Sequence, residues 1–122
     1  MSFQVYNSFS RTKETFEPLS EGVVRMYNCG PTVYSRVHIG NWRAFLFADL
    51  LRRWFEHEGY EVRQVMNITD VGHLTDELAD EGEDKIEAQA RREGVDPWKI
   101  SETYAGQFLD DAKTLGCKEA MV

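Results

Sequence analysis

Residues 23–41, with the sequence VVRMYNCGPTVYSRVHIGN, constrain the fold more than any other part of the chain. The first of them are β-branched and aromatic, which favours a strand over residues 23–28. Cys29, Gly30 and Pro31 interrupt that strand, and an apolar helix is expected to begin at the sequence HIGN. In α/β proteins, a strand that leads through a glycine-containing turn into a helix presents backbone N–H groups to an anion.

The elements that follow predict a parallel sheet. A helix over 41–58 is indicated by apolar residues at helical spacing, and Gly59 is well placed to end it. A second strand is expected over 60–67, with Val62 and Val65 inside. Strand, helix and strand over this length imply a right-handed parallel crossover. The fold class is therefore α/β. The residues expected on the apolar face of the helix are Phe45, Phe47, Leu50, Leu51, Trp54 and Phe55.

The chain of 122 residues is long enough for one compact domain, 1–122. We expect four parts in it: a β-hairpin and connector over 1–22, a β-α-β core over 23–67, an acidic loop over 68–83 and a helical segment over 84–122. Short strands over 3–7 and 13–16 form the hairpin. Two helices are expected in the last part, one over 83–92 and one capped by Asp96. Six of the nine residues over 76–84 are acidic. That pattern favours a solvated loop, although a cation site without EF-hand spacing is an alternative.

Composition and charge narrow the functional classes. The formal net charge is −7, so a strong grip on a nucleic acid backbone by this chain alone is not expected. The sequence contains neither an apolar run of membrane-spanning length nor the apolar centre of a signal peptide. Two cysteines do not make a disulfide framework. We therefore expect a cytoplasmic protein with reduced thiols and no membrane partner.

Three residues of the strand–turn–helix stretch could carry chemistry. Cys29 could be a nucleophile, a zinc ligand or a structural thiol, and the structural role is favoured because no CxxC or HxxxH pattern accompanies it. His38 could donate a hydrogen bond to a phosphate at the helix end or simply cap the helix. Gly40 allows a ligand to approach the backbone closely.

A family resemblance sharpens this interpretation. The sequence CGPTVY followed by HIGN, with NITDVGHLTDEL and DEGEDKIE further on, resembles the class I cysteinyl-tRNA synthetases. The resemblance covers most of this chain but only the opening part of the family's catalytic domain. It implies the first half of a Rossmann-like nucleotide-binding fold. It also implies a parent enzyme that activates L-cysteine with ATP and transfers it to tRNA(Cys).

The resemblance also implies roles for single residues. Thr32, His38, Gly40 and Asn41 match the family's ATP-binding signature. Of these, His38 and Asn41 would be catalytic, with His38 stabilising the charge that develops at the α-phosphate. Cys29, Gly30 and Thr69 would contact cysteine. Cys29 would also be one zinc ligand, and the family's other ligands, a cysteine, a histidine and a glutamate, lie downstream of the matching region. Asn67 and Asp70 are instead expected to fix the loop after the second strand.

The resemblance sets expectations for the chain by itself. The second half of the sheet, the KMSKS-type loop and the anticodon-binding region have no counterpart in this sequence. We therefore expect little or no aminoacylation, weak nucleotide binding, no zinc, and self-association through an open sheet edge that leaves Phe3, Phe45 and Phe47 partly uncovered. The alternatives are a stand-alone relative that binds a nucleotide or partner without catalysis, and a piece of a cysteine:amino-sugar ligase. The GPTVY and HIGN sequences favour the tRNA enzyme.

Overall fold

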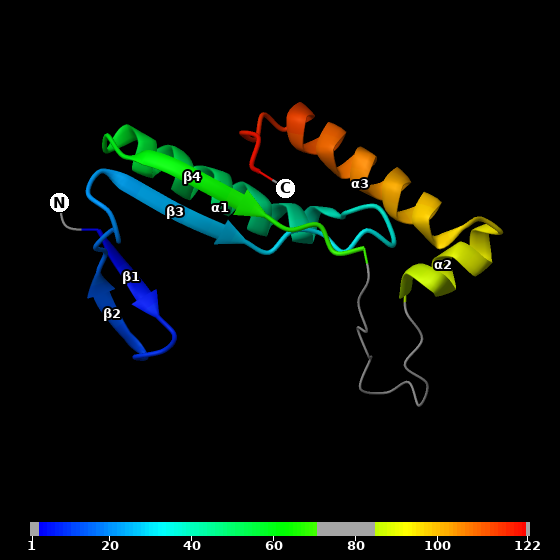
Figure 1. Cartoon of the computed structure of the whole chain (residues 1–122), viewed down its shortest axis with the longest axis horizontal. Helices are drawn as coiled ribbons and strands as arrows, with labels where there is room; N and C mark the ends of the chain where they lie inside the picture. Colours follow the sequence, from blue (N-terminus) through cyan, green and yellow to red (C-terminus); the bar gives the residue numbers. More distant parts are fainter. Residues whose placement is uncertain (1–2, 71–84, 122) are drawn as a thin grey trace.

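The computed structural model describes residues 3–70 and 85–121. It is an α/β structure in which a small parallel sheet carries a long helix on one face and a hairpin at one end (Figure 1). The expected acidic cluster at 76–84 lies outside the described residues. In chain order, the elements are β1 (Gln4–Asn7), β2 (Thr12–Thr15), β3 (Val23–Asn28), α1 (Ile39–His57), β4 (Glu61–Met66), α2 (Lys85–Glu93) and α3 (Pro97–Thr114).

The N-terminal hairpin is confirmed within one residue of its expected bounds. β1 and β2 are antiparallel, and their register runs from Gln4 opposite Thr15 to Asn7 opposite Thr12. Phe3 stacks on Trp54 of α1 with ring centroids 4.3 Å apart. This aromatic contact attaches the hairpin to the C-terminal part of α1.

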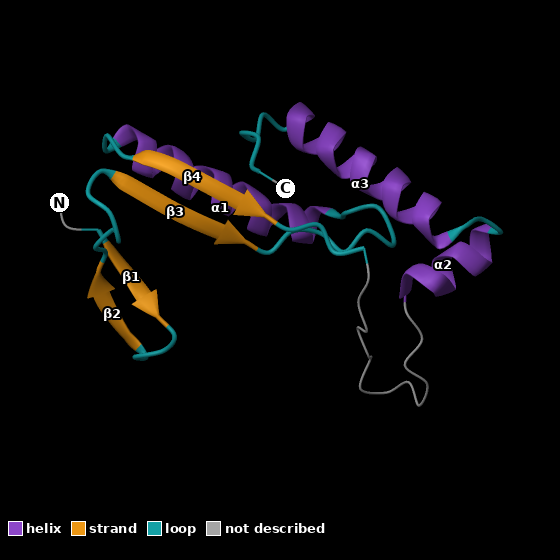
Figure 2. Ribbon diagram, viewed as in Figure 1, coloured by secondary structure: helices purple, strands orange, loops and turns teal. Residues whose placement is uncertain are grey.

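The parallel crossover is also confirmed. β3 and β4 pair in parallel from Val23 opposite Glu61 to Asn28 opposite Met66, and α1 covers one face of the pair (Figure 2). Val24 is buried beneath the helix, as expected of a strand residue on the covered face.

The prediction that Val62 and Val65 both lie inside was wrong. Side chains three apart in a strand point to opposite faces, so the two cannot share the covered face. Gln64 is buried instead, while Val65 is 37% exposed on the open face. Gln64 is hydrogen-bonded on both sides, since its Nε2 donates to Asn28 Oδ1 at 2.9 Å and its Oε1 accepts from Arg52 Nη1 at 3.3 Å. These bonds satisfy the polar side chain beneath the helix.

Helix α1 begins two residues earlier than its periodicity predicted. His38 is its N-cap, and the Nδ1 atom of that side chain accepts a hydrogen bond from the Gly40 N–H at 3.0 Å. A polar cap of this kind satisfies one of the first N–H groups of a helix, so the helix can start directly after it. At the other end, Gly59 has a φ of 89°, a left-handed conformation that glycine adopts without strain.

Helix α2 packs on α3, and α3 contacts α1 through aromatic side chains. As predicted, Asp96 caps α3 and accepts a hydrogen bond from the Trp98 N–H at 2.9 Å. Where α3 meets α1, Phe108 stacks on Trp42 at a centroid distance of 5.1 Å. The contact between α2 and α3 is formed by the buried side chains Ile86, Ala90 and Ile100.

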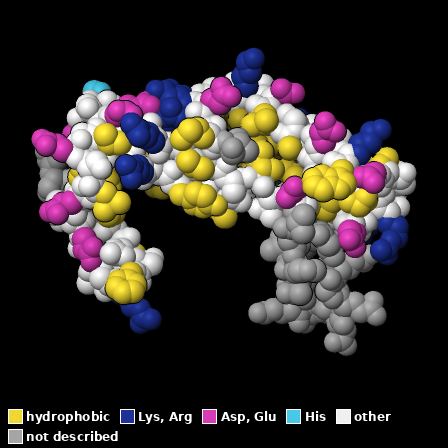
Figure 3. Space-filling model, viewed as in Figure 1, with side chains coloured by type: hydrophobic (Ala, Val, Ile, Leu, Met, Phe, Trp, Pro, Cys, Tyr) yellow, Lys and Arg dark blue, Asp and Glu magenta, His cyan; other side chains and the backbone are white. Residues whose placement is uncertain are grey.

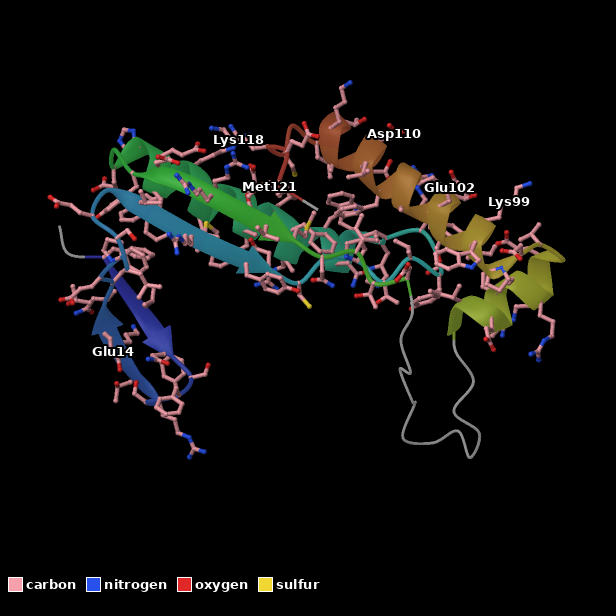
Figure 4. The ribbon with its side chains drawn as sticks, viewed as in Figure 1. Glu14, Lys99, Glu102, Asp110, Lys118 and Met121 are labelled. Carbon is pink, nitrogen blue, oxygen red and sulfur yellow. The ribbon has the colours of Figure 1, made fainter. Side chains whose placement is uncertain are left out.

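After α3 the chain returns to the free edge of β4. The Met66 N–H donates to the Met121 carbonyl at 2.9 Å, and the Met121 N–H donates to the Gln64 carbonyl at 3.1 Å. This parallel bridge adds Met121 to the sheet beside β4, and Figure 4 shows Lys118 and Met121 on the short segment that lies there.

Polar side chains of α1 hold that returning segment. Asp49 accepts from the Lys118 N–H at 2.7 Å, and Arg53 donates to the Gly116 carbonyl at 2.6 Å. Hydrogen bonds from Lys118 and Arg52 lower the pKa of Glu56, although partial burial opposes the shift. The segment is therefore tied to the helix by both its backbone and its side chains.

The face of the sheet turned away from α1 is open. Tyr27, 69% exposed, lies opposite Val65 in the register, and both side chains point away from the helix. Figure 3 views this side of the molecule, where hydrophobic side chains gather near the middle. Within the described ranges, no helix is long and apolar enough to span a membrane.

Candidate functional site

The carboxyl ends of β3 and β4 lie at the same edge of the sheet, and the loops that leave them are bonded together. The Val33 N–H donates to the Thr69 carbonyl at 3.1 Å, and the Thr69 N–H donates to the Pro31 carbonyl at 3.0 Å. These bonds continue the parallel pairing beyond the strands, with Thr32 opposite Thr69. Ligands of open α/β sheets bind at this edge, outside the carboxyl ends of the strands.

Gly30 and Asn67 make the closest contact between the two loops. The Gly30 N–H donates to Asn67 Oδ1 at 3.1 Å. A Cβ atom at position 30 would lie 1.7 Å from the backbone oxygen of Asn67. Position 30 therefore requires glycine because two backbones meet there, whatever ligand the site holds.

The side chain of Asn67 also reaches Thr69. Its Nδ2 donates to Thr69 Oγ1 at 2.8 Å. Asn67 was expected to fix the loop after β4, and this bond, to a residue two positions away, is a local bond of that kind. The bond from Gly30 spans 37 positions and extends that role across the two loops.

His38 lies at the exposed start of α1. Because its Nδ1 accepts from the Gly40 N–H, the proton of a neutral ring is on Nε2. The ring therefore caps the helix through one nitrogen and offers an N–H donor through the other. Gly40 leaves room for this arrangement, since a Cβ there would lie 2.8 Å from Cε1 of His38.

A concave region of about 300 Å³ adjoins the start of α1. Of the predicted ATP-binding residues, Thr32, His38 and Asn41 line it, and so does Gly30. Gly40 is not among the lining residues, but its N–H donates to the His38 ring. The other lining residues are Pro31, Tyr34, Ser35, Arg36, Val37 and Phe45. The structure thus brings three of the four predicted ATP-binding residues to one surface.

The cysteine-contacting residues are only partly brought together. Gly30 and Thr69 are linked through Asn67, whereas Cys29 is exposed and does not line the concave region. A larger cavity of about 480 Å³ lies between α1, α3 and β4, with Trp42, Met66 and Phe108 among its walls. None of the predicted site residues lines this cavity. We place the candidate site at the strand-end loops because the hydrogen-bonding groups converge there.

Arg36 is a lining residue that sequence reasoning missed. Its Nη2 and Nε donate to the two carboxylate oxygens of Asp111 on α3, at 2.9 and 3.2 Å. This hydrogen bonding raises the pKa of Arg36 and fixes the loop before His38 against α3. A separation of 75 positions gives no local sequence signal for such a pair.

The described residues do not fit the zinc site that the family resemblance implies. Within residues 3–70 and 85–121, no three side chains of His, Cys, Asp or Glu are grouped to hold a metal ion. Cys29 provides one thiol, whereas a structural or catalytic zinc ion needs three or four protein ligands.

Comparison with known proteins gives a consistent result. The family described as tRNA synthetases class I (C) catalytic domain matches residues 15–122. A cysteine--tRNA ligase of Chlorobium chlorochromatii is 53% identical over 116 residues, which are 95% of this chain and 24% of that protein. Cysteine--tRNA ligase 1 of Burkholderia lata is 50% identical over all 122 residues, or 26% of its length. The enzyme of Thermus thermophilus is 48% identical over 94% of the chain and 24% of that protein. The chain spans about a quarter of these relatives.

Proposed function

The chain belongs to the family of class I (C) tRNA synthetase catalytic domains, and from this premise we propose that it forms the opening part of a cysteine--tRNA ligase active site. The whole enzyme would activate L-cysteine with ATP and transfer the cysteinyl group to tRNA(Cys), in the cytoplasm. The observation that carries the proposal is the position of Thr32, His38 and Asn41 around one concavity at the strand ends.

His38 would bind ATP through its Nε2–H while its Nδ1 holds the start of α1. A helix N-terminus attracts negative charge, and a preoriented donor stabilises the charge that develops on the α-phosphate when the amino acid carboxylate attacks it. Thr32 and Asn41, which line the same concavity, would contribute further polar contacts. Arg36 would keep this loop in place through its pairing with Asp111.

Cys29, Gly30 and Thr69 would form the start of the cysteine pocket. Their support is the resemblance together with the bonded strand-end loops. A zinc ion is outside this proposal, because the described residues do not assemble its ligands.

For the isolated chain we propose little or no aminoacylation, since only one side of the nucleotide is covered. Two alternatives remain: a stand-alone relative that binds without catalysis, and a piece of a cysteine:amino-sugar ligase. The relatives compared above are named as tRNA ligases, which favours the tRNA enzyme. The length of the encoding reading frame would separate a stand-alone protein from a piece of a longer one.

ATP should bind the isolated chain weakly, no tighter than a dissociation constant of about 1 mM, which corresponds to roughly 4 kcal/mol. Gly40→Val should weaken binding most, because a side chain there displaces the His38 ring and fills the space before the helix. His38→Ala should cost about 1 kcal/mol, the value of one charge-assisted hydrogen bond. Titration followed by backbone amide shifts measures both effects, and the shifts should cluster over residues 29–42.

Two variants of the same residue types serve as controls for the ATP titration. His57→Ala removes a histidine from the other end of α1. Gly106→Val adds a side chain to α3, where nothing lies within 4 Å of an added Cβ. Both should bind ATP as the unmodified chain does. The absence of shifts, or shifts confined to 76–84, would contradict the proposed nucleotide site.

The chain should also self-associate through the sheet. Within the described ranges β4 is the only strand that pairs with β3, so the other edge of β3 carries free N–H and C=O groups beyond the bridge from Val23 to Ser20. Of the three phenylalanines expected to be uncovered, Phe47 is 65% exposed, while Phe3 and Phe45 are half-buried among aromatic neighbours. Light scattering should give a mass that rises with protein concentration.

A charged substitution tests where the self-association occurs. Val65→Lys, on the open sheet face, should shift the chain towards the monomer. Phe9→Lys removes an apolar side chain that is 97% exposed at the hairpin turn and should leave association unchanged. A monomer at every concentration would count against the prediction.

A further inference from the structure

We infer that Asn67 is the positioning residue of the proposed cysteine site: its side-chain amide holds the backbone beside Cys29 and keeps the Thr69 hydroxyl as a hydrogen-bond donor for the amino acid. The inference rests on the proposed function, because it assigns Thr69 to that site. It adds a residue that connects the loop after β3 to the loop after β4, and it assigns the Thr69 hydroxyl the role of a hydrogen-bond donor.

The orientation of the Asn67 amide follows from its neighbours. The Gly30 N–H can only donate, so the side-chain atom that faces it at 3.1 Å is Oδ1. The other side-chain atom is therefore the amide nitrogen, which lies 2.8 Å from Thr69 Oγ1. Each end of the amide has one partner, and the Gly30 backbone determines which end faces Thr69.

This orientation determines what Thr69 can offer a ligand. Its oxygen accepts the Asn67 N–H, so the hydroxyl hydrogen is not used in that bond. Over the described residues, the Thr69 side chain has no second hydrogen-bond partner in the structure. The hydroxyl is thus available as a donor to an anionic acceptor. On an amino acid such as cysteine, the acceptor is the carboxylate or the thiolate.

The backbone around Asn67 leaves little freedom for this arrangement. Thr69 is bonded to Pro31 and Val33 through its own N–H and carbonyl. Gly30 packs against the Asn67 carbonyl closely enough to exclude a Cβ atom. Both loops are consequently fixed relative to each other, and Asn67 provides the only side-chain bond between them among the described residues.

The test uses Asn67→Asp, which preserves side-chain shape and changes polarity. Oδ1 of the aspartate still accepts the Gly30 N–H, but its second oxygen accepts where the amide donated. It therefore draws the Thr69 hydroxyl hydrogen inward. L-Cysteine titration of the reduced chain, followed by backbone amide shifts, should give a dissociation constant about tenfold higher than in the unmodified chain. L-Alanine lacks the thiol and cysteamine lacks the carboxylate, so the ligand that retains the tenfold effect identifies the acceptor.

The Thr69→Val background separates positioning from added charge. If Asn67 acts through the hydroxyl, Thr69→Val alone weakens binding about tenfold, and adding Asn67→Asp weakens it no further. Repulsion by the new carboxylate, or a purely structural role of Asn67, would weaken L-cysteine binding equally in both backgrounds. That result would overturn the inference. Asn7→Asp is the matched control, since Asn7 also accepts a backbone N–H and donates to a side chain, but in the hairpin.

Two further outcomes distinguish the inference from the proposed function. If the dissociation constant of Asn67→Asp for L-cysteine is within twofold of that of the unmodified chain, the inference is overturned and the proposed site stands. The absence of L-cysteine shifts in the unmodified chain would overturn the site and the inference together.

In the absence of ligand, hydrogen exchange of the Gly30 amide should accelerate in Asn67→Ala and stay slow in Asn67→Asp. Equal exchange in both variants would show that Asn67 does not hold this loop.

Discussion

Replacing Phe108 with alanine should lower the free energy of unfolding by about 3–5 kcal/mol. Phe108 is 2% exposed and is the main apolar contact between α3 and α1. Its ring stacks on Trp42 with an interplanar angle of 13°, and it meets Phe45 edge to face at 5.1 Å. Alanine would lose these contacts and leave a cavity between the two helices. Urea unfolding followed by far-UV circular dichroism measures the change.

Leu109→Ala is the matched control for Phe108→Ala. Leu109 is the next residue on α3, but it is 45% exposed, so its truncation should cost less than about 1 kcal/mol. Equal losses in the two variants would mean that α3 is not held to α1 through the aromatic contact. The comparison is internal to one helix, so helix propensity does not account for a difference of this size.

The sequence predicted the elements in which apolar residues recur at one regular spacing along the chain. The face of α1 contains Phe45 and Phe55 at helical spacing, and α3 shows the same repeat from Ile100 to Phe108. Both helices lie where expected, and so do β3 and β4. The error at Val65 arose because YEVRQVMN was read as apolar without applying the alternation of a strand, and a buried glutamine has no hydrophobic signal.

Contacts between distant residues could not be predicted in this way. Met121 joins the sheet edge through backbone hydrogen bonds that any residue except proline could make. Arg36 and Asp111 are ordinary surface types until the fold brings them together. In the candidate site, the HIGN signature predicted His38 and Asn41, and both line one concave region. The coupling of Gly30 to Asn67 depends on two strand ends meeting across 37 positions, and the sequence offers no period or spacing that reports it.

Gly30→Ala should destabilise the chain by about 3 kcal/mol and disrupt both strand-end loops. The added Cβ would lie 1.7 Å from the Asn67 backbone oxygen and 2.9 Å from Cγ of Met66. A backbone atom cannot rotate away as a side chain can, so the loops must separate. That movement would break the bond from the Gly30 N–H to Asn67 and strain the pairing of Thr32 with Thr69. Urea unfolding gives the loss of stability, and amide shifts at 29–33 and 67–70 locate it.

Gly106→Ala makes the same chemical change where the structure has room for it. Gly106 lies within α3 and has nothing within 4 Å of an added Cβ, so alanine should raise the free energy of unfolding by about 0.5–1 kcal/mol through helix propensity. The two substitutions should therefore act in opposite directions. If Gly30→Ala were neutral or stabilising, the loops would not be in close backbone contact, and neither the glycine requirement nor the coupling through Asn67 would hold. If both loops rearranged but ATP shifts over 34–42 persisted, the nucleotide and cysteine parts of the site would be independent of each other.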